Sequence, residues 1–287
     1  MSKIQVGFLM SYDYELLKKS IPPVYSKADS IFIALDKDHK TWSGKTIEID
    51  PSFFTWLENF DTDKKITIYK DFFYDASLNP MENEVRERKM LGQKMGIGNW
   101  LIQIDSDEYF VNFKNFVKDL RNNDHYLKRP EKNQVQIAGF FINLYKYVEG
   151  GILYVDESRN QKFATNYPSY QTGRNTRKRV IYTNNLVLHE CLSRTEAEIK
   201  TKFENWGHSH QVNFKSFITK WRKLDHTNYK DYQNFFYLEP EKWKNLDFVK
   251  GNSISEISDN LEYKSLMPSP LFLWKKNFGQ WFKFLFK

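Results

Sequence analysis

The sequence contains a single cysteine, Cys191, among its 287 residues. One thiol cannot form a disulfide within the chain, which is consistent with a protein kept in a reducing compartment. The apolar run close to the N-terminus is too short for a signal peptide or a membrane span. We therefore expect a cytoplasmic protein, in which any membrane contact is peripheral and lies on the inner face of the plasma membrane.

A linker rich in proline, glycine or serine is also missing. The chain is long enough to bury a sizeable core, so one large domain is favoured over two small ones. Residues 10–17, MSYDYELL, contain no glycine, which argues against a glycine-rich phosphate loop after the first strand. Zinc-finger spacings and the aromatic motifs of RNA-binding domains are absent too, and we expect no specific nucleic-acid partner.

Basic residues are in excess, with 43 Lys and Arg against 36 Asp and Glu, a net charge of +7. This excess favours an anionic partner and does not choose between a nucleotide diphosphate, a phospholipid surface and nucleic acid. Aromatic residues make up 17% of the chain. Aromatic platforms are common in carbohydrate sites, although we expect most of these rings in the core.

Three short apolar segments, residues 4–10, 30–35 and 65–69, predict strands that alternate with helices. This order is typical of a doubly wound parallel sheet, whose ligands gather at the carboxyl ends of the strands. Polar residues follow the first two strands at that edge, and they include Ser11, Asp13 and Asp36. Asp36 is also a good turn or N-cap residue, and both interpretations stay open.

Residues 99–110, NWLIQIDSDEYF, join an apolar strand to a cluster of carboxylates. A core strand cannot bury that much negative charge without a compensating cation, so Asp105, Asp107 and Glu108 are expected at the exit of the strand. Asp105 and Asp107 share one face of an extended chain, with Cα atoms about 7 Å apart. Mg²⁺ typically binds one or two carboxylates together with substrate phosphates, and a nucleotide diphosphate would complete such a site.

This Asp-Ser-Asp triplet at a strand end resembles the DxD motif of nucleotide-sugar glycosyltransferases with the GT-A fold. The resemblance is to the family 2 type of bacterial polysaccharide and lipopolysaccharide assembly, and it extends from Ile4 to about Leu224. A second block, in which a strand ends in Leu-His-Glu at 188–190 and a helix precedes Asn-Trp-Gly-His-Ser at 205–209, looks like the C-terminal half of these enzymes.

The resemblance implies a Rossmann-like α/β fold with a mixed, mostly parallel sheet flanked by helices. We expect one catalytic domain over residues 1–265, with a nucleotide-binding half at 1–110 and an acceptor-binding half at 111–225. A basic, aromatic and amphipathic tail is expected at 266–287.

The resemblance also implies roles for individual residues. Mn²⁺ or Mg²⁺ is expected on Asp107, with Asp105 reaching the ribose or a metal-bound water. The nucleoside is expected near Ser11, Asp13 and Asp36, and the diphosphate near Arg88, on a predicted helix over residues 79–95. A late histidine often supplies a further metal ligand, and His208 and His189 are the two candidates. We favour His208 for contact with the metal or the nucleotide, and His189 for the acceptor side of the nucleotide-sugar site.

Glu190 is the expected general base, with Glu108 as the second choice. The chain lacks a clear Glu-Asp pair in the acceptor region, where it departs from the usual pattern of the family.

The polar span 156–179 shows neither helical nor strand periodicity and is expected to be a long loop. It carries Arg174, Arg177, Lys178 and Arg179, which are suited to gripping phosphates. A solvated basic loop is the equal alternative.

Residues 271–287 predict an amphipathic helix, with Trp and Phe on one side and lysines on the other. That pattern is typical of a helix lying in the interface of an anionic membrane, although a helix docked on its own domain would look similar.

The sequence thus predicts a metal-dependent glycosyltransferase. It would move a sugar from a nucleotide-sugar donor to a glycan or lipid-linked acceptor in cell-surface polysaccharide synthesis, with inversion. The alternatives are a nucleotidyltransferase acting on sugar phosphates and a noncatalytic basic protein that binds membranes or nucleic acid.

Overall fold

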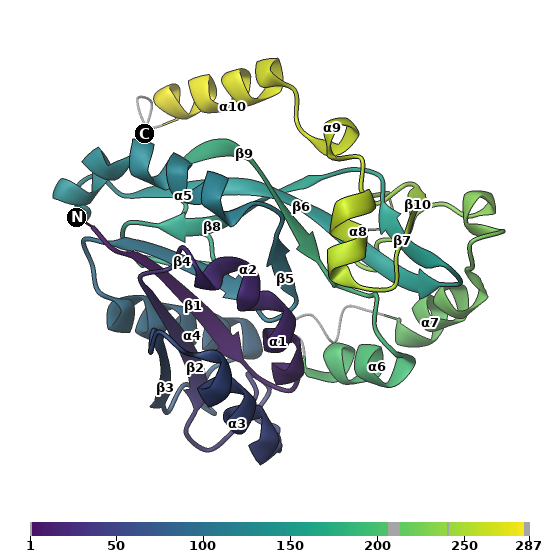
Figure 1. Ribbon diagram of the computed structural model, residues 1–287, viewed down its shortest axis with the longest axis horizontal. Helices are drawn as coiled ribbons and strands as arrows, with labels where there is room; N and C mark the ends of the chain where they lie inside the picture. The colour runs from purple at the N-terminus through teal and green to yellow at the C-terminus, as the bar shows by residue number, and fades with distance from the viewer. Residues whose placement is uncertain (1, 206–212, 240, 284–287) are drawn as a thin grey trace.

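A mixed β-sheet runs through the computed structural model, which describes residues 2–205, 213–239 and 241–283. Four parallel strands form one half of the sheet, in the order β3, β2, β1, β4 (Figure 1). Their bounds are Ile4–Met10 for β1, Ser30–Asp36 for β2, Ile66–Asp71 for β3 and Trp100–Asp105 for β4. The parallel α/β sheet expected from the sequence is confirmed for this half.

Helices cover both faces of the parallel half because its inner strands β1, β2 and β4 are largely apolar on both sides. The helices are α1 (Leu17–Ser20), α2 (Pro22–Tyr25), α3 (Pro51–Phe60) and α4 (Pro80–Met95). The first three pack on the face of β1 that carries Val6 and Phe8. On the other face α4 approaches closely over Gly7, where a Cβ atom would lie only 2.8 Å from Sδ of Met95.

The second half of the sheet is largely antiparallel and continues the order as β4, β8, β6, β7, β10. These strands are β6 (Val135–Val148), β7 (Gly151–Val155), β8 (Arg159–Thr165) and β10 (Leu246–Lys250). β9 (Arg179–His189) pairs with β6 in parallel, and its end pairs with the short β5 (Glu108–Phe110). This last pairing brings Glu108 opposite His189, although the two are far apart in sequence.

The expectation of a long loop over residues 156–179 is wrong, because β8 lies inside it. Asn160 and Gln161 line the pocket described below, while Phe163 and Ala164 are buried in the core. The first residues of β8 are polar on both faces because they line the pocket. The sequence of this strand therefore lacks the alternation of apolar and polar residues that would have identified it.

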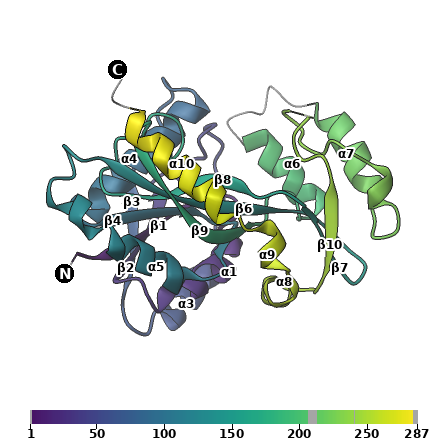
Figure 2. The same ribbon diagram turned by 90° about the horizontal axis from the view of Figure 1, so that it is seen from above.

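The remaining helices complete the layers on the second half of the sheet. They are α5 (Phe113–Asn122), α6 (Glu196–Asn205), α7 (Phe214–Lys223), α8 (Ile254–Asn260), α9 (Tyr263–Leu266) and α10 (Pro270–Phe282), with short 3₁₀ turns at Tyr14–Leu16, Asp124–Lys128 and Tyr229–Asp231. α6 and α7 enclose one apolar cluster with β6 and β7, and α8 and α9 enclose another on the opposite face. α10 lies across the outside of the molecule along β9 (Figure 2). Among the described helices none is both long and apolar enough to cross a bilayer.

Candidate functional site

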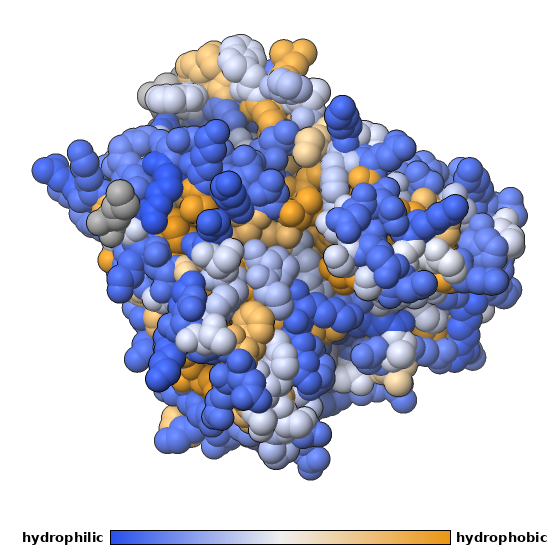
Figure 3. Space-filling model, in the orientation of Figure 1, coloured by the Kyte–Doolittle hydropathy of each residue, from blue (hydrophilic) through white to orange (hydrophobic). Residues whose placement is uncertain are grey.

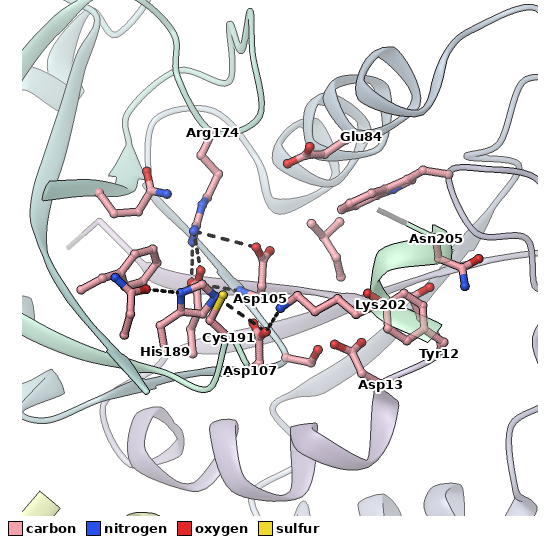
Figure 4. Close-up of a pocket in the computed structure, with 18 of the residues that line it drawn as sticks. Tyr12, Asp13, Glu84, Asp105, Asp107, Arg174, His189, Cys191, Lys202 and Asn205 are labelled. Carbon is pink, nitrogen blue, oxygen red and sulfur yellow. Dashed lines mark hydrogen bonds and ion pairs between the residues drawn. The ribbon is translucent and has the colours of Figure 1, made fainter. Parts of the chain in front are cut away.

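A pocket of about 430 Å³ lies at the carboxyl ends of β1, β2 and β4 (Figure 4). Eight of the residues expected at the site line this pocket: Ser11, Asp13, Asp36, Asp105, Asp107, Glu108, Arg174 and His189. Arg88, Arg177 and Glu190 are not among the lining residues. His208 lies outside the described residues. The expectation that acidic strand ends gather at one edge is therefore confirmed for the strand ends of β1, β2 and β4.

Asp105, the last residue of β4, is held by two guanidinium groups. Arg88 of α4 donates a hydrogen bond of 2.8 Å to Oδ1, and Arg174 lies 3.8 Å from Oδ2. Burial opposes ionisation of this carboxyl, but Arg88 and Arg174 outweigh it and hold its pKa below the usual value. Arg88 also bonds Glu84 at 2.9 Å and is almost completely buried. Its guanidinium therefore orders the acidic wall of the pocket, whereas the sequence suggested a contact with the diphosphate.

Asp107 lies in the turn between β4 and β5 and binds two cations through the same oxygen. Oδ2 accepts hydrogen bonds from Nη2 of Arg194 at 2.5 Å and from Nζ of Lys202 at 2.8 Å. Burial again opposes ionisation, yet Lys202, His189 and Arg194 together hold the pKa of Asp107 far below its usual value. Asp107 is thus ionised near neutral pH.

The sequence did not indicate that Arg194 and Lys202 belong to this site. Arg194 bridges Asp107 and Asp13 and so ties the end of β4 to the end of β1. Lys202 projects from α6 into the pocket (Figure 4). One signal was present: Lys202 lies three residues after Ile199 and directly before Phe203, which places a lysine on the apolar side of the helix.

Glu108 is fully buried and forms a two-pronged ion pair with Arg174. Nη1 and Nη2 of Arg174 lie 2.6 and 2.5 Å from the two carboxylate oxygens. Burial raises the pKa of Glu108 to about 7, against the opposing charge of Arg174. Because both oxygens are engaged, the geometry does not favour Glu108 as a general base. Arg174 is likewise neither a free phosphate grip nor part of a solvated loop, while Arg177 is exposed at the surface.

His189, at the end of β9, presents one ring nitrogen to Asp107. Its Nδ1 lies 2.8 Å from the amide oxygen of Asn143, and its ring stacks on Phe141. Burial lowers the pKa of His189 to about 4, so the ring is neutral near pH 7. The bond to Asn143 fixes the proton on Nδ1, which leaves the lone pair of Nε2 facing Oδ2 of Asp107 at 3.7 Å.

The residues present can hold a divalent cation. Ligand atoms of Asp107, Glu108 and His189 all lie within 4.8 Å of one another. Glu108 is committed to Arg174, so a carboxylate oxygen and a neutral imidazole nitrogen remain, a donor pair that divalent metals accept. An ion bound at Oδ2 of Asp107 would compete with the ammonium group of Lys202, which donates to that oxygen.

Glu190 lies next to the pocket and does not line it. Its Oε2 accepts a hydrogen bond of 2.6 Å from the hydroxyl of Tyr109, and Lys19 lies 3.3 Å from the same oxygen. The side chain is 3% exposed. A role as general base stays a prediction, and these contacts make Glu190 an anchor between β5, β9 and α1.

Asp36 organises the loops after β2 and β3. Oδ1 accepts from the backbone amides of Asp38 and Lys40, and Oδ2 from those of Phe73 and Tyr74, at 2.8 to 3.0 Å. All four bonds are to the backbone, so the structure supports the turn interpretation of Asp36 over a contact with the ribose.

Comparison with known proteins does not assign the chain to a family. No protein-family model and no curated protein matches the chain. Among solved structures, mannose-6-phosphate isomerase from Helicobacter pylori matches with 13% identity and a TM-score of 0.30, over 54% of this chain and 56% of that one. The chain thus spans about half the length of that isomerase, and a similarity at this TM-score carries no argument about fold or activity.

Proposed function

We propose that the protein is a glycosyltransferase that moves a sugar from a nucleotide-diphosphate sugar to a glycan or lipid-linked acceptor, with inversion, in the synthesis of cell-surface polysaccharide. One observation carries this proposal: Asp105 and Asp107 meet the carboxyl ends of β1 and β2 in one pocket. That edge of a parallel sheet is where nucleotides bind in open α/β folds. The GT-A type of fold is part of the proposal.

The charges at the pocket support binding of the nucleotide-sugar donor together with a divalent metal ion. Ion pairs link the following described residues: Asp13, Glu84, Asp105, Asp107 and Glu108 with Arg88, Arg174, Arg194 and Lys202. The carboxylates of this network outnumber its cations by five to four, and Lys40 and Arg159 are further cations in the pocket lining. A diphosphate would therefore meet a network whose positive charges are already paired. A divalent ion held by the residues of this pocket would supply the missing positive charge.

Asp107 and His189 would hold Mn²⁺ or Mg²⁺, with Asp105 beside them for the ribose or a water of the ion. When bound, the metal supplies a Lewis acid that neutralises the leaving diphosphate. Lys202, which lines the same pocket, would donate to the diphosphate, and Arg194 would keep Asp107 charged and oriented. Since Tyr109 and Lys19 hold Glu190 outside the lining of the pocket, we assign Glu190 a positioning role.

The test is the release of nucleotide from UDP-sugars and GDP-sugars in the presence of Mn²⁺. Asp107→Asn keeps the shape of the side chain and removes its charge, and we expect at least a 100-fold loss of turnover, the scale of removing one strong electrostatic contact. Asp63→Asn, at a side chain that is 57% exposed, is the matched control. Full activity of Asp107→Asn would refute the metal site. Release of pyrophosphate from a nucleoside triphosphate and a sugar phosphate would instead identify a nucleotidyltransferase.

A further inference from the structure

α10 is attached to the body of the protein by its polar side. Asn277 accepts a hydrogen bond of 2.8 Å from the backbone amide of Tyr182 and donates one of 2.9 Å to its carbonyl oxygen. Gln280 accepts from the amide of Val180 at 3.1 Å. These bonds satisfy backbone groups at the edge of β9, and the helix covers this part of the strand. Covering an exposed strand edge with a helix is a common way to protect it. The least exposed residues of the helix are thus Asn277 and Gln280, together with Leu273.

The apolar side of α10 faces solvent instead. Five large side chains are exposed by 44 to 62%: Leu271, Trp274, Phe278, Trp281 and Phe282. Trp274 stacks on Phe278, and Phe278 contacts Phe282, so the rings form one continuous surface. Figure 3 shows apolar side chains at the top of the molecule, where α10 lies. A surface helix normally buries its apolar face, so this reversed orientation indicates that something else covers the rings.

The charges around these rings are positive. Residues 270–283 contain Lys275, Lys276 and Lys283 and no Asp or Glu. At 100° per residue, Lys275 follows Phe282 around the helix, and Lys276 and Lys283 follow further along the same flank. The start of β9 adds Arg179, whose guanidinium lies 4.7 Å from the ring of Trp281, and the exposed Arg177 and Lys178 precede it.

We propose that α10 and the start of β9 form a docking surface for an anionic phospholipid membrane. Trp and Phe side chains partition into the interfacial layer of a bilayer, and Lys and Arg beside them bind the phosphates. The 13-residue helix is about 20 Å long, too short to span the apolar core and suited to lying in its surface. A second copy of the chain is a poorer partner because the same basic residues would meet across the interface.

This proposal goes beyond sugar transfer and does not depend on it. It also gives a role to the basic residues at 177–179, which line no part of the pocket. Any lipid-linked acceptor would then be met at the membrane surface.

Cosedimentation of the full chain with vesicles tests the proposal. We expect binding to vesicles of phosphatidylcholine mixed with phosphatidylglycerol, weaker binding to phosphatidylcholine alone, and loss of binding as salt is raised. The double variant Trp274→Ser with Trp281→Ser should bind at least tenfold more weakly. Phe72→Ser is the apolar control, because Phe72 is 50% exposed and follows β3.

A charge variant separates the electrostatic contribution. Lys275→Glu with Lys276→Glu should also reduce binding at least tenfold, whereas Lys215→Glu with Lys223→Glu, the same change of net charge at exposed positions of α7, should not. Thermal unfolding checks that each variant is folded. Equal binding by all variants, or no binding by the wild type, would overturn the proposal. So would a dimer in solution that the Trp variants abolish without any binding to vesicles. Nucleotide release from donors stays unaffected in each case, which keeps this test separate from that of the enzyme.

Discussion

The ammonium group of Lys202 donates a hydrogen bond of 2.8 Å to the carboxylate of Asp107, and both side chains are buried. The charge of Asp107 raises the pKa of Lys202, against burial, which lowers it. The lysine therefore stays charged in the pocket. Oδ2 of Asp107 already accepts from Arg194 and Lys202, so a metal ion at the same oxygen would be a third positive charge there, and we expect it to compete with the lysine.

This competition predicts two opposite effects of Lys202→Met. The apparent affinity for Mn²⁺ should rise, because the ion no longer displaces an ammonium group. Turnover should fall about 100-fold, because the leaving diphosphate loses one positively charged donor. A Mn²⁺ titration of donor hydrolysis measures both. Lys200→Met, on the same helix with a side chain that is 66% exposed, is the control. Weaker binding of Mn²⁺ by Lys202→Met would show that the two cations do not compete.

Arg174→Met should lower the stability of the folded protein, and we expect this effect to exceed any direct effect on binding of the nucleotide-sugar donor. Removing one partner of a buried ion pair leaves Glu108 uncompensated, at a cost of about 3–5 kcal/mol in the free energy of unfolding. The double variant with Glu108→Gln should recover part of that loss. Urea unfolding of the single and double variants measures the coupling, and Arg177→Met, at an exposed neighbour, is the control. If Arg174→Met weakens only nucleotide binding, Arg174 is a phosphate contact after all.

Glu190→Gln should lower thermal stability and reduce turnover by less than about 100-fold, the lower range for loss of a general base. The reason is the hydrogen bond of 2.6 Å from Tyr109, which the amide weakens. Tyr109→Phe removes the same bond and should have the same effect on both the melting temperature and kcat. A large loss of kcat in Glu190→Gln alone, at unchanged melting temperature, would instead identify Glu190 as the base.

The parallel half of the fold could be predicted because β1, β2 and β4 are largely apolar on both faces and the edge strand β3 alternates. Short runs of apolar residues, such as the one before Asp105, can be recognised directly in the sequence. β8 could not be predicted because its first residues are polar and line the pocket. β5 could not be predicted because three residues are too few to show a periodic pattern. The pairing of β5 with β9 depends on contacts distant in sequence, which no local pattern specifies.

The acidic half of the site could also be predicted, while its cationic half could not. Carboxylates at a strand end follow from strand geometry and the cost of burying charge. The partners of Asp107 come from α6 and the loop before it, nearly a hundred residues away, and only the fold brings them there. Glu87 illustrates the same limit, since nothing in the pattern of its helix indicates its burial beside Trp42.

Glu87 should make the stability of the protein depend on pH. Burial raises its pKa to about 8, while a short hydrogen bond from Nε1 of Trp42 and the charge of Arg88 oppose the shift. The folded state therefore holds a proton that the unfolded chain has already lost, and stability should fall as pH rises from about 5 to 8. Glu87→Gln cannot ionise and keeps an oxygen for Trp42, so its stability relative to the wild type should grow over that range. Urea unfolding at several pH values measures the difference, with the exposed Glu58→Gln as the control. A gap between Glu87→Gln and the wild type that stays constant from pH 5 to 8 would mean that Glu87 is already ionised in the folded protein.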